Sequence, residues 1–102
     1  MTWQNGGESE RIMLEIRLTQ PAWYTNGYYR LHTDDGKPSI TVLHEYYTAS
    51  AEDNAGNDYD VYWSISNREA FYNGDEDCCD WDEPEEIYSW NEGKPVSAKI
   101  IW

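Results

Sequence analysis

The chain has 102 residues and a net charge of −13, and this length suits one domain with a single modest core. Residues 1–50 hold six acids and four bases, and residues 51–102 hold fourteen acids and three bases, so the two halves carry −2 and −11. This imbalance argues against direct binding to nucleic acid or to an anionic membrane, and it favours a basic protein as the partner. The sixteen aromatic residues argue against disorder.

The first half of the chain predicts three strands. Alternating aliphatic residues predict a strand over residues 12–19, with one buried face. Pro21 and Asn26-Gly27 predict a turn, after which residues 28–32 form a second strand. Asp35-Gly36 is typical of a hairpin turn, and the β-branched and aromatic residues at 40–48 predict the third strand.

The second half predicts a polar loop over residues 49–58 and a strand over residues 59–66. Asn67 is a suitable cap for one helical turn over residues 67–73. Residues 87–90 and 96–102 predict a closing hairpin with a five-residue connection. We therefore expect residues 1–102 to form a single, mainly β domain of about six antiparallel strands, a meander closed as a small barrel or sandwich. An α+β fold is the alternative.

Residues 75–86, here called the acidic segment, hold eight carboxylates in twelve positions and no base. Like charges this close repel one another and cost stability, and solubility alone does not require such density. In an extended chain, residues two apart lie about 6.6 Å apart on one face. The pairs Asp75/Asp77, Asp80/Asp82 and Glu83/Glu85 would then present negative charge at a spacing comparable to that of nucleic-acid phosphates.

This pattern favours a small inhibitor that mimics nucleic acid and occupies the basic site of a nucleic-acid-binding protein. The residues expected to supply charge are Asp75, Glu76, Asp77, Asp80, Asp82, Glu83, Glu85 and Glu86, and the expected apolar anchors are Trp81, Tyr72 and Tyr88. In size, acidity and aromatic content the chain resembles inhibitors from phages and mobile elements, including anti-CRISPR and anti-restriction proteins. The resemblance is one of type, and no residue pattern names a family.

Two other functions fit the same sequence: an immunity protein that neutralises a toxin nuclease, and a protein-interaction domain that does not mimic nucleic acid. The doublets Tyr28/Tyr29, Tyr46/Tyr47 and Tyr62/Trp63 offer a Tyr-rich sheet face as an alternative interface or as a homodimer contact. No stretch has the roughly eighteen apolar residues of a membrane span, and the first residues do not resemble a signal peptide. We therefore expect a cytoplasmic protein, acting in the host cytoplasm if it is phage-encoded.

Neither a catalytic motif nor a cofactor motif is present in the sequence, so we do not expect an enzyme or a bound cofactor. Residues 53–60 carry oxygen ligands around Gly56 but depart from the calcium-loop pattern, which favours a plain polar loop. His32 and His44 fall on neighbouring predicted strands and are expected to pack across them. Cys78 and Cys79 are adjacent, which suits neither a structural disulfide nor a metal site.

Overall fold

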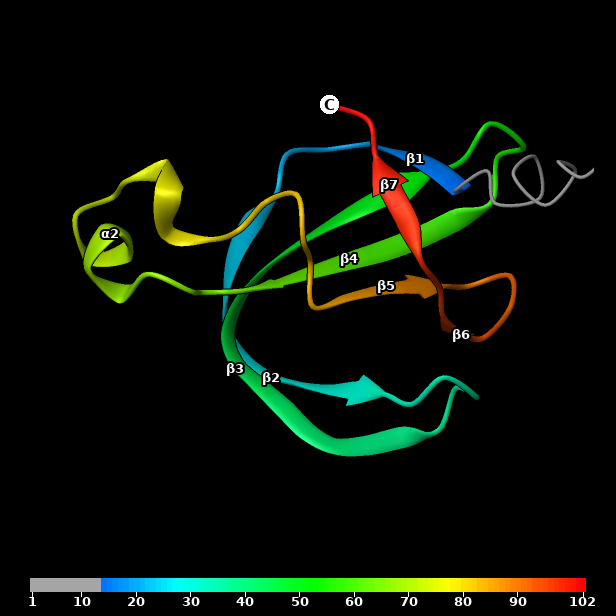
Figure 1. Cartoon of the computed structure of the whole chain (residues 1–102), viewed down its shortest axis with the longest axis horizontal. Coiled ribbons are helices and arrows are strands. Elements are labelled where there is room, and N and C mark those ends of the chain that lie inside the picture. The colour runs from blue at the N-terminus through cyan, green and yellow to red at the C-terminus, as the bar shows by residue number, and fades with distance from the viewer. Residues whose placement is uncertain (1–13) are drawn as a thin grey trace, which may run out of the picture.

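A seven-stranded sheet dominates the computed structural model, which describes residues 14–102 (Figure 1). The strands are β1 (Leu14–Leu18), β2 (Trp23–His32), β3 (Pro38–Glu52), β4 (Asp58–Ser64), β5 (Glu86–Ser89), β6 (Lys94–Pro95) and β7 (Ala98–Ile100). A five-residue helix, α2 (Arg68–Tyr72), and a 3₁₀ turn, η1 (Glu76–Cys78), lie between β4 and β5. The prediction of a mainly β fold with short helical turns is confirmed. Residues 12–13 of the first predicted strand lie outside the described residues.

The sheet curls into a half-barrel in the order β6-β5-β4-β3-β1-β7, with β2 paired to the first part of β3. Within residues 14–102 all strand pairs are antiparallel except β1 and β7, which run parallel. The predicted closing hairpin is therefore wrong in its second strand: β5 pairs with β6, and β7 crosses to the far edge (Figure 1). The Val96 N–H donates to the Ile87 carbonyl (2.9 Å) and the Ile101 N–H donates to the Ile16 carbonyl (2.8 Å), so the C-terminal residues bridge both edges of the sheet.

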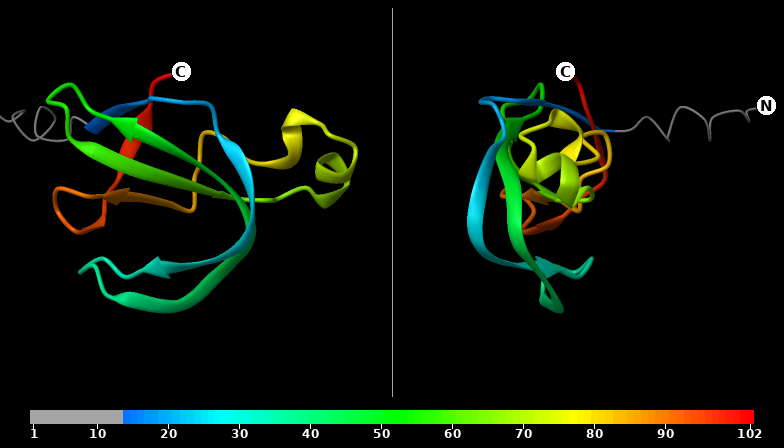
Figure 2. Two further views of the ribbon diagram at one scale, coloured as in Figure 1. Left: turned by 180° about the vertical axis from the view of Figure 1, so that it is seen from behind. Right: turned by 90° about the vertical axis from the view of Figure 1, so that its left-hand side faces the viewer.

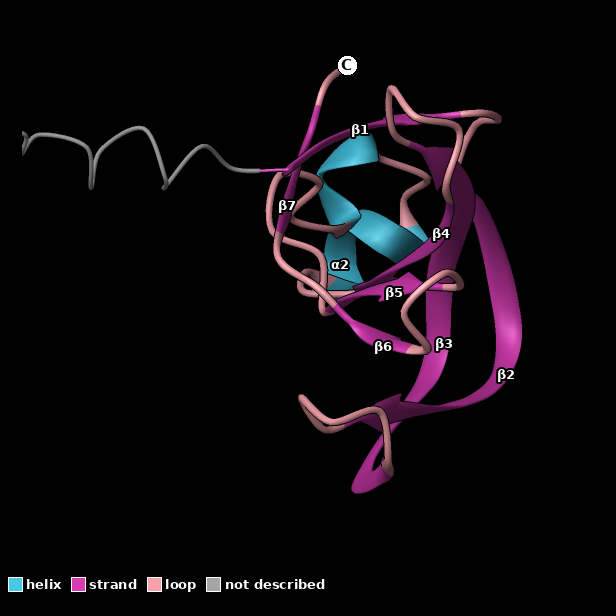
Figure 3. Cartoon of the chain, turned by 90° about the vertical axis from the view of Figure 1, so that its right-hand side faces the viewer, coloured by secondary structure: helices cyan, strands magenta, loops and turns pink. Residues whose placement is uncertain are grey.

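The far halves of β2 and β3, residues 28–44, form a bent two-stranded arm (Figures 2 and 3). The bend lies where the pairing shifts between Thr25 and Tyr28, so the predicted turn at Asn26-Gly27 is instead a bulge inside a longer strand. Opposite the bulge, Glu45 has a φ of 61°. Its carboxylate accepts from the Tyr24 hydroxyl (2.8 Å), which holds the bend in place.

The arm curls back until its turn meets the turn between β5 and β6 (Figure 3). Gly36 has a φ of 87°, and a Cβ at this position would collide with the Gly93 carbonyl oxygen. Glycine is therefore required here both by backbone conformation and by space. The predicted Asp35-Gly36 hairpin turn is confirmed, and it also closes the arm against the half-barrel.

The core lies inside the half-barrel and is covered by the segment between β4 and β5. Ile16, Val61 and Trp63 are almost fully buried. Ala49 and Ala51 are buried beside them, and β3 continues to Glu52, so the predicted loop over residues 49–58 is wrong at its start. These small apolar residues let the strands pack closely although their neighbours are polar. In the part of the chain that the structure describes, neither helical segment is long and apolar enough to cross a membrane.

Candidate partner-binding surface

The acidic segment follows α2, passes through η1 and ends in the first residue of β5. Asn67 caps α2 as predicted, because its side chain accepts from the Ala70 N–H (3.1 Å). The Cys78 carbonyl accepts from the N–H groups of Ser66 (2.8 Å) and Asn67 (3.1 Å), which ties the segment to the end of β4. These bonds fix the path of the backbone between the acidic side chains.

Cys78 and Cys79 anchor the middle of the segment in the core. Both are free thiols and both are buried, with their sulfur atoms 3.9 Å apart. Burial raises the pKa of Cys79 to about 12, so this thiol stays neutral and behaves as a small apolar side chain. The two cysteines thereby hold the segment down while the carboxylates on either side of them remain in water.

Seven of the eight carboxylates are exposed: Asp75, Glu76, Asp77, Asp80, Asp82, Glu83 and Glu85. The ion pairs found within residues 14–102 involve other acids, such as Asp35, Glu45 and Glu92. Asp82 accepts from the Trp102 indole (3.0 Å) and Glu85 accepts from the Ser64 hydroxyl (2.9 Å). The chain thus presents a concentration of negative charge that its own described bases do not neutralise.

The shape of this surface differs from the extended row that the spacing predicted. Residues 76–78 form η1, and the Glu83 N–H donates to the Asp80 carbonyl (3.0 Å) in a turn. The pairs Asp75/Asp77 and Asp80/Asp82 therefore lie on compact turns instead of one face of a strand. The carboxylates therefore form a compact patch, and the spacing of about 6.6 Å expected for an extended strand does not apply to them.

Glu86 is the exception among the eight carboxylates, and its expected role on the surface needs correction. Its side chain is buried, with 6% of the residue exposed. The carboxylate accepts from the Tyr29 hydroxyl and from the His32 N–H (2.7 Å), and it lies 3.0 Å from His32 Nδ1. Both carboxylate oxygens of Glu86 accept hydrogen bonds from the arm. Because Glu86 is the first residue of β5, these bonds attach the arm to the half-barrel.

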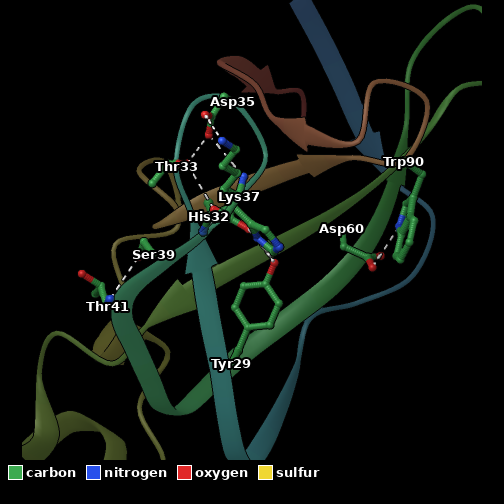
Figure 4. A network of polar contacts seen from close by, with 10 residues as sticks. Tyr29, His32, Thr33, Asp35, Lys37, Ser39, Thr41, Asp60 and Trp90 are labelled. Carbon is green, nitrogen blue, oxygen red and sulfur yellow. Dashed lines mark hydrogen bonds and ion pairs between the residues drawn. The ribbon is translucent and has the colours of Figure 1, made fainter.

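Aromatic rings gather around Glu86 beneath the arm, among them Tyr29 and His32, which are drawn in Figure 4. The Tyr29 and Tyr62 rings stack with centroids 3.6 Å apart, and the Tyr88 ring lies 4.8 Å from His32. Burial and the nearby carboxylate raise the pKa of Tyr29 well above its ordinary value. Tyr88 thus belongs to this cluster and does not stand among the exposed carboxylates, contrary to its expected role as an anchor there.

The other two predicted anchors differ from each other. Tyr72 is 76% exposed at the end of α2, immediately before the acidic segment. Trp81 is half-buried, with its ring edge-on to Trp63 (5.3 Å) and its indole N–H donating to the Glu76 carbonyl (2.6 Å). Trp81 therefore supports the core with one side of its ring and borders the surface with the other.

An open groove of about 740 Å³ lies next to the acidic segment. It is lined by Leu18, Thr19, Gln20, Pro21, Ala22, Glu76, Trp81 and Trp102. Sequence reasoning identified Glu76 and Trp81 but missed Trp102 and the connection between β1 and β2. No local pattern marks these residues, because the groove is built from three segments that are far apart along the chain.

The predicted Tyr-rich face is not assembled as the doublets suggested. Tyr28 is 75% exposed and stacks on His44, while Tyr29 turns inward. Tyr46 is buried, and Tyr62 faces the cluster beneath the arm. Each doublet has an inward ring as predicted, but of the expected outward rings only Tyr28 projects far into solvent. The three doublets therefore form no continuous Tyr surface.

Residues 53–57 form a tight polar turn. The Asp53 carboxylate accepts from the Asn57 amide side chain (3.0 Å), the Tyr59 hydroxyl (2.7 Å) and the Ala55 N–H (2.9 Å). These bonds lower the pKa of Asp53 to about 2 and occupy both oxygens. Within residues 14–102, no group of three or more His, Cys, Asp or Glu residues is arranged to hold a metal ion.

Comparisons with known proteins give no relative from which a function could be inferred. No family model matches the chain, and neither the search of curated proteins nor the search of solved structures found a match.

Proposed function

We propose that this chain is a binding protein without catalytic activity that occupies the basic, nucleic-acid-binding surface of another protein and so inhibits it. The observation that carries the proposal is the set of seven exposed carboxylates in residues 75–85, which form no ion pair with the described bases. Keeping such a cluster costs stability through repulsion, and a basic partner would relieve that repulsion on binding.

A rigid attachment supports this role. The buried cysteines and the backbone bonds of Cys78 hold the segment in one conformation before any partner arrives. A preorganised surface loses little conformational entropy on binding, and its charge accelerates association with a basic target. Inhibition would be stoichiometric and competitive with nucleic acid, and the protein itself would bind neither nucleic acid nor a cofactor.

The proposed target is a basic nucleic-acid-binding protein or nuclease in the same cytoplasm, such as a defence nuclease met by a phage inhibitor. An immunity protein that covers the active site of a toxin nuclease would use the same surface. Which class applies depends on the partner, and the experiment that tests the proposal also identifies it.

The test is affinity capture from a host lysate with three proteins: the natural chain, a segment variant and a control. The segment variant carries Asp77→Lys, Asp80→Lys and Glu83→Lys, since these exposed side chains make no hydrogen bond or ion pair within the described residues. The control carries Glu15→Lys, Asp34→Lys and Asp58→Lys, which are exposed elsewhere and change the net charge by the same amount.

We expect the natural chain and the control to retain a basic partner at low salt, to release it as salt rises, and to displace nucleic acid from it one for one. The segment variant should lose this partner while its circular dichroism spectrum is unchanged. Equal capture by all three proteins, or a captured partner that still binds its nucleic acid, would show the proposal to be wrong.

A further inference from the structure

The groove beside the acidic segment is lined mainly by apolar and aromatic side chains. Its lining includes Leu18, at the end of β1, and Pro21 and Ala22, in the connection to β2. The Trp81 and Trp102 side chains also line it. An occupant must therefore present a flat or aliphatic surface to two aromatic rings.

The polar edges of both indoles are already satisfied inside the protein. The Trp81 N–H donates to the Glu76 carbonyl (2.6 Å), and the Trp102 N–H donates to Asp82 (3.0 Å). Trp102 also stacks on buried Trp63, with ring centroids 6.4 Å apart, although it is itself 63% exposed. What remains for a ligand is the electron-rich face of each ring, which attracts cations and apolar groups but offers no hydrogen-bond donor.

The charge in the groove points to a cation. Glu76 is the one ionisable residue of the lining, and its carboxylate takes part in none of the ion pairs found within residues 14–102. Gln20, in contrast, already donates to the Ser50 hydroxyl (3.2 Å). An exposed carboxylate and two indole rings that line the same groove complement a group that is both planar and positively charged.

We propose that this groove binds an arginine side chain from the partner's basic surface, with the guanidinium stacked on Trp102 and paired with Glu76. Arginine fits better than lysine because its guanidinium is planar, stacks on aromatic rings and binds carboxylates through two parallel hydrogen bonds. The inference rests on the proposed function and adds a specific anchor to what would otherwise be attraction by charge alone.

The test uses the full chain and three probe peptides: nonaarginine, nonalysine and nonacitrulline. Citrulline has the shape of arginine without its charge. Affinities are measured by isothermal titration calorimetry. The indole N–H signals in NMR spectra of the ¹⁵N-labelled protein report which tryptophans the peptide contacts. We expect nonaarginine to bind about two- to fivefold more tightly than nonalysine, as one cation–π contact would produce, and to shift the Trp81 and Trp102 signals.

Matched variants locate the effect. Trp102→Leu should abolish the preference for arginine and leave nonalysine binding unchanged. Trp90→Leu is the control, because Trp90 is equally exposed (61%) and its indole also donates to an aspartate, Asp60 (3.1 Å; Figure 4), away from the groove. Glu76→Gln should reduce the preference, whereas Asp77→Asn removes the same charge from an exposed neighbour outside the groove lining and should not.

Three results would overturn the groove assignment alone: equal affinity for nonaarginine and nonalysine, indole shifts of the same size with nonacitrulline, or a Trp102 ring already covered by a second copy or by residues 1–13. In each case charge-driven binding to the acidic segment could persist. Failure of both cationic peptides to bind at low salt would instead remove the proposed function together with the anchor.

Discussion

The exposed part of the acidic segment and the cluster beneath the arm use the same chemical group in opposite ways. Residues 75–85 carry seven carboxylates in water with few internal donors. Glu86, the next residue in the run, is buried and receives bonds from Tyr29 and His32. The difference is set by donors and not by sequence neighbours: a carboxylate is tolerated inside only where hydrogen bonds replace its hydration. Glu86 therefore contributes to the fold, whereas the other seven stay in water and are the ones that the proposed function assigns to a partner.

The largest effect is expected from removing the buried carboxylate. Glu86→Ala leaves the Tyr29 hydroxyl and the His32 N–H without their acceptor, which should lower the free energy of unfolding by about 2–3 kcal/mol. Urea denaturation measures the loss, and hydrogen exchange should speed up first at the arm. Glu83→Ala is the control from the same run and should cost nothing. Equal stability of the two variants would contradict the distinction between the two regions.

A smaller loss of stability is expected from disrupting the contact between the turn of the arm and the turn between β5 and β6, with Glu86 left in place. Gly36→Ala combines a positive φ with a collision against the Gly93 carbonyl, and it should cost about 2 kcal/mol. Gly56→Ala is a matched control, because Gly56 has a similar φ of 84° but open space around its Cα. The difference between their thermal unfolding midpoints isolates the contact between the two turns. If both variants lose the same stability, the arm does not depend on this contact.

The Asp53 turn gives an intermediate case, an accessible carboxylate that does have internal donors. Its pKa is lowered from 3.8 to about 2, chiefly by the Asn57 side chain. A depressed pKa stabilises the folded state at pH values above 3.8, and this contribution disappears as the pH falls toward 2. Burial together with Asp53 raises the pKa of Tyr59 from 10.0 to about 12, so the neutral phenol's contribution is complete below pH 10 and lost as the pH rises toward 12.

Urea denaturation of the natural chain and of Asp53→Asn between pH 2 and pH 12 measures both the acid and the alkaline loss of stability. The acid loss should be smaller in the variant, because its side chain no longer takes up a proton. The alkaline loss should also shrink, since Tyr59 no longer faces a negative charge. Parallel stability curves for the two proteins would show that the turn does not contribute in this way.

Local patterns in the sequence were sufficient for much of the fold. The alternation of Val61, Trp63 and Ile65 predicted β4, and Asn67 correctly marked the start of α2. Features that depend on distant pairing were missed. Nothing near Ala98–Ile100 indicates that this strand runs parallel to β1, because its partner lies more than eighty positions earlier.

The candidate site shows the same limit. Composition located the acidic segment, but the eight carboxylates look alike along the chain, and only the fold separates Glu86 from the rest. One signal was available: Glu86 and Tyr88 flank Ile87, so a strand beginning one residue earlier places both on one face. The contribution of Trp102 to the groove had no such signal, since it depends on where the C-terminus crosses the sheet.

The smallest effect concerns the stability cost of the exposed carboxylates themselves. Neutralising three of them, with Asp77→Asn, Asp80→Asn and Glu83→Gln, should raise the free energy of unfolding by no more than about 0.5 kcal/mol at low ionic strength. Salt screens charges over about 10 Å at 0.1 M, so the gain should vanish in 1 M sodium chloride, where the screening length is about 3 Å. Urea denaturation at both ionic strengths measures this.

A gain that persists at high salt would mean that the side chains destabilise by some route other than repulsion. The same variant should bind a basic partner more weakly than the natural chain does. Stability and binding would then change in opposite directions at the same residues, as expected where charge is retained for a partner at the expense of the fold. At Glu86 stability and binding are not expected to change in opposite directions, because removing this buried carboxylate lowers stability and removes no charge from the exposed surface.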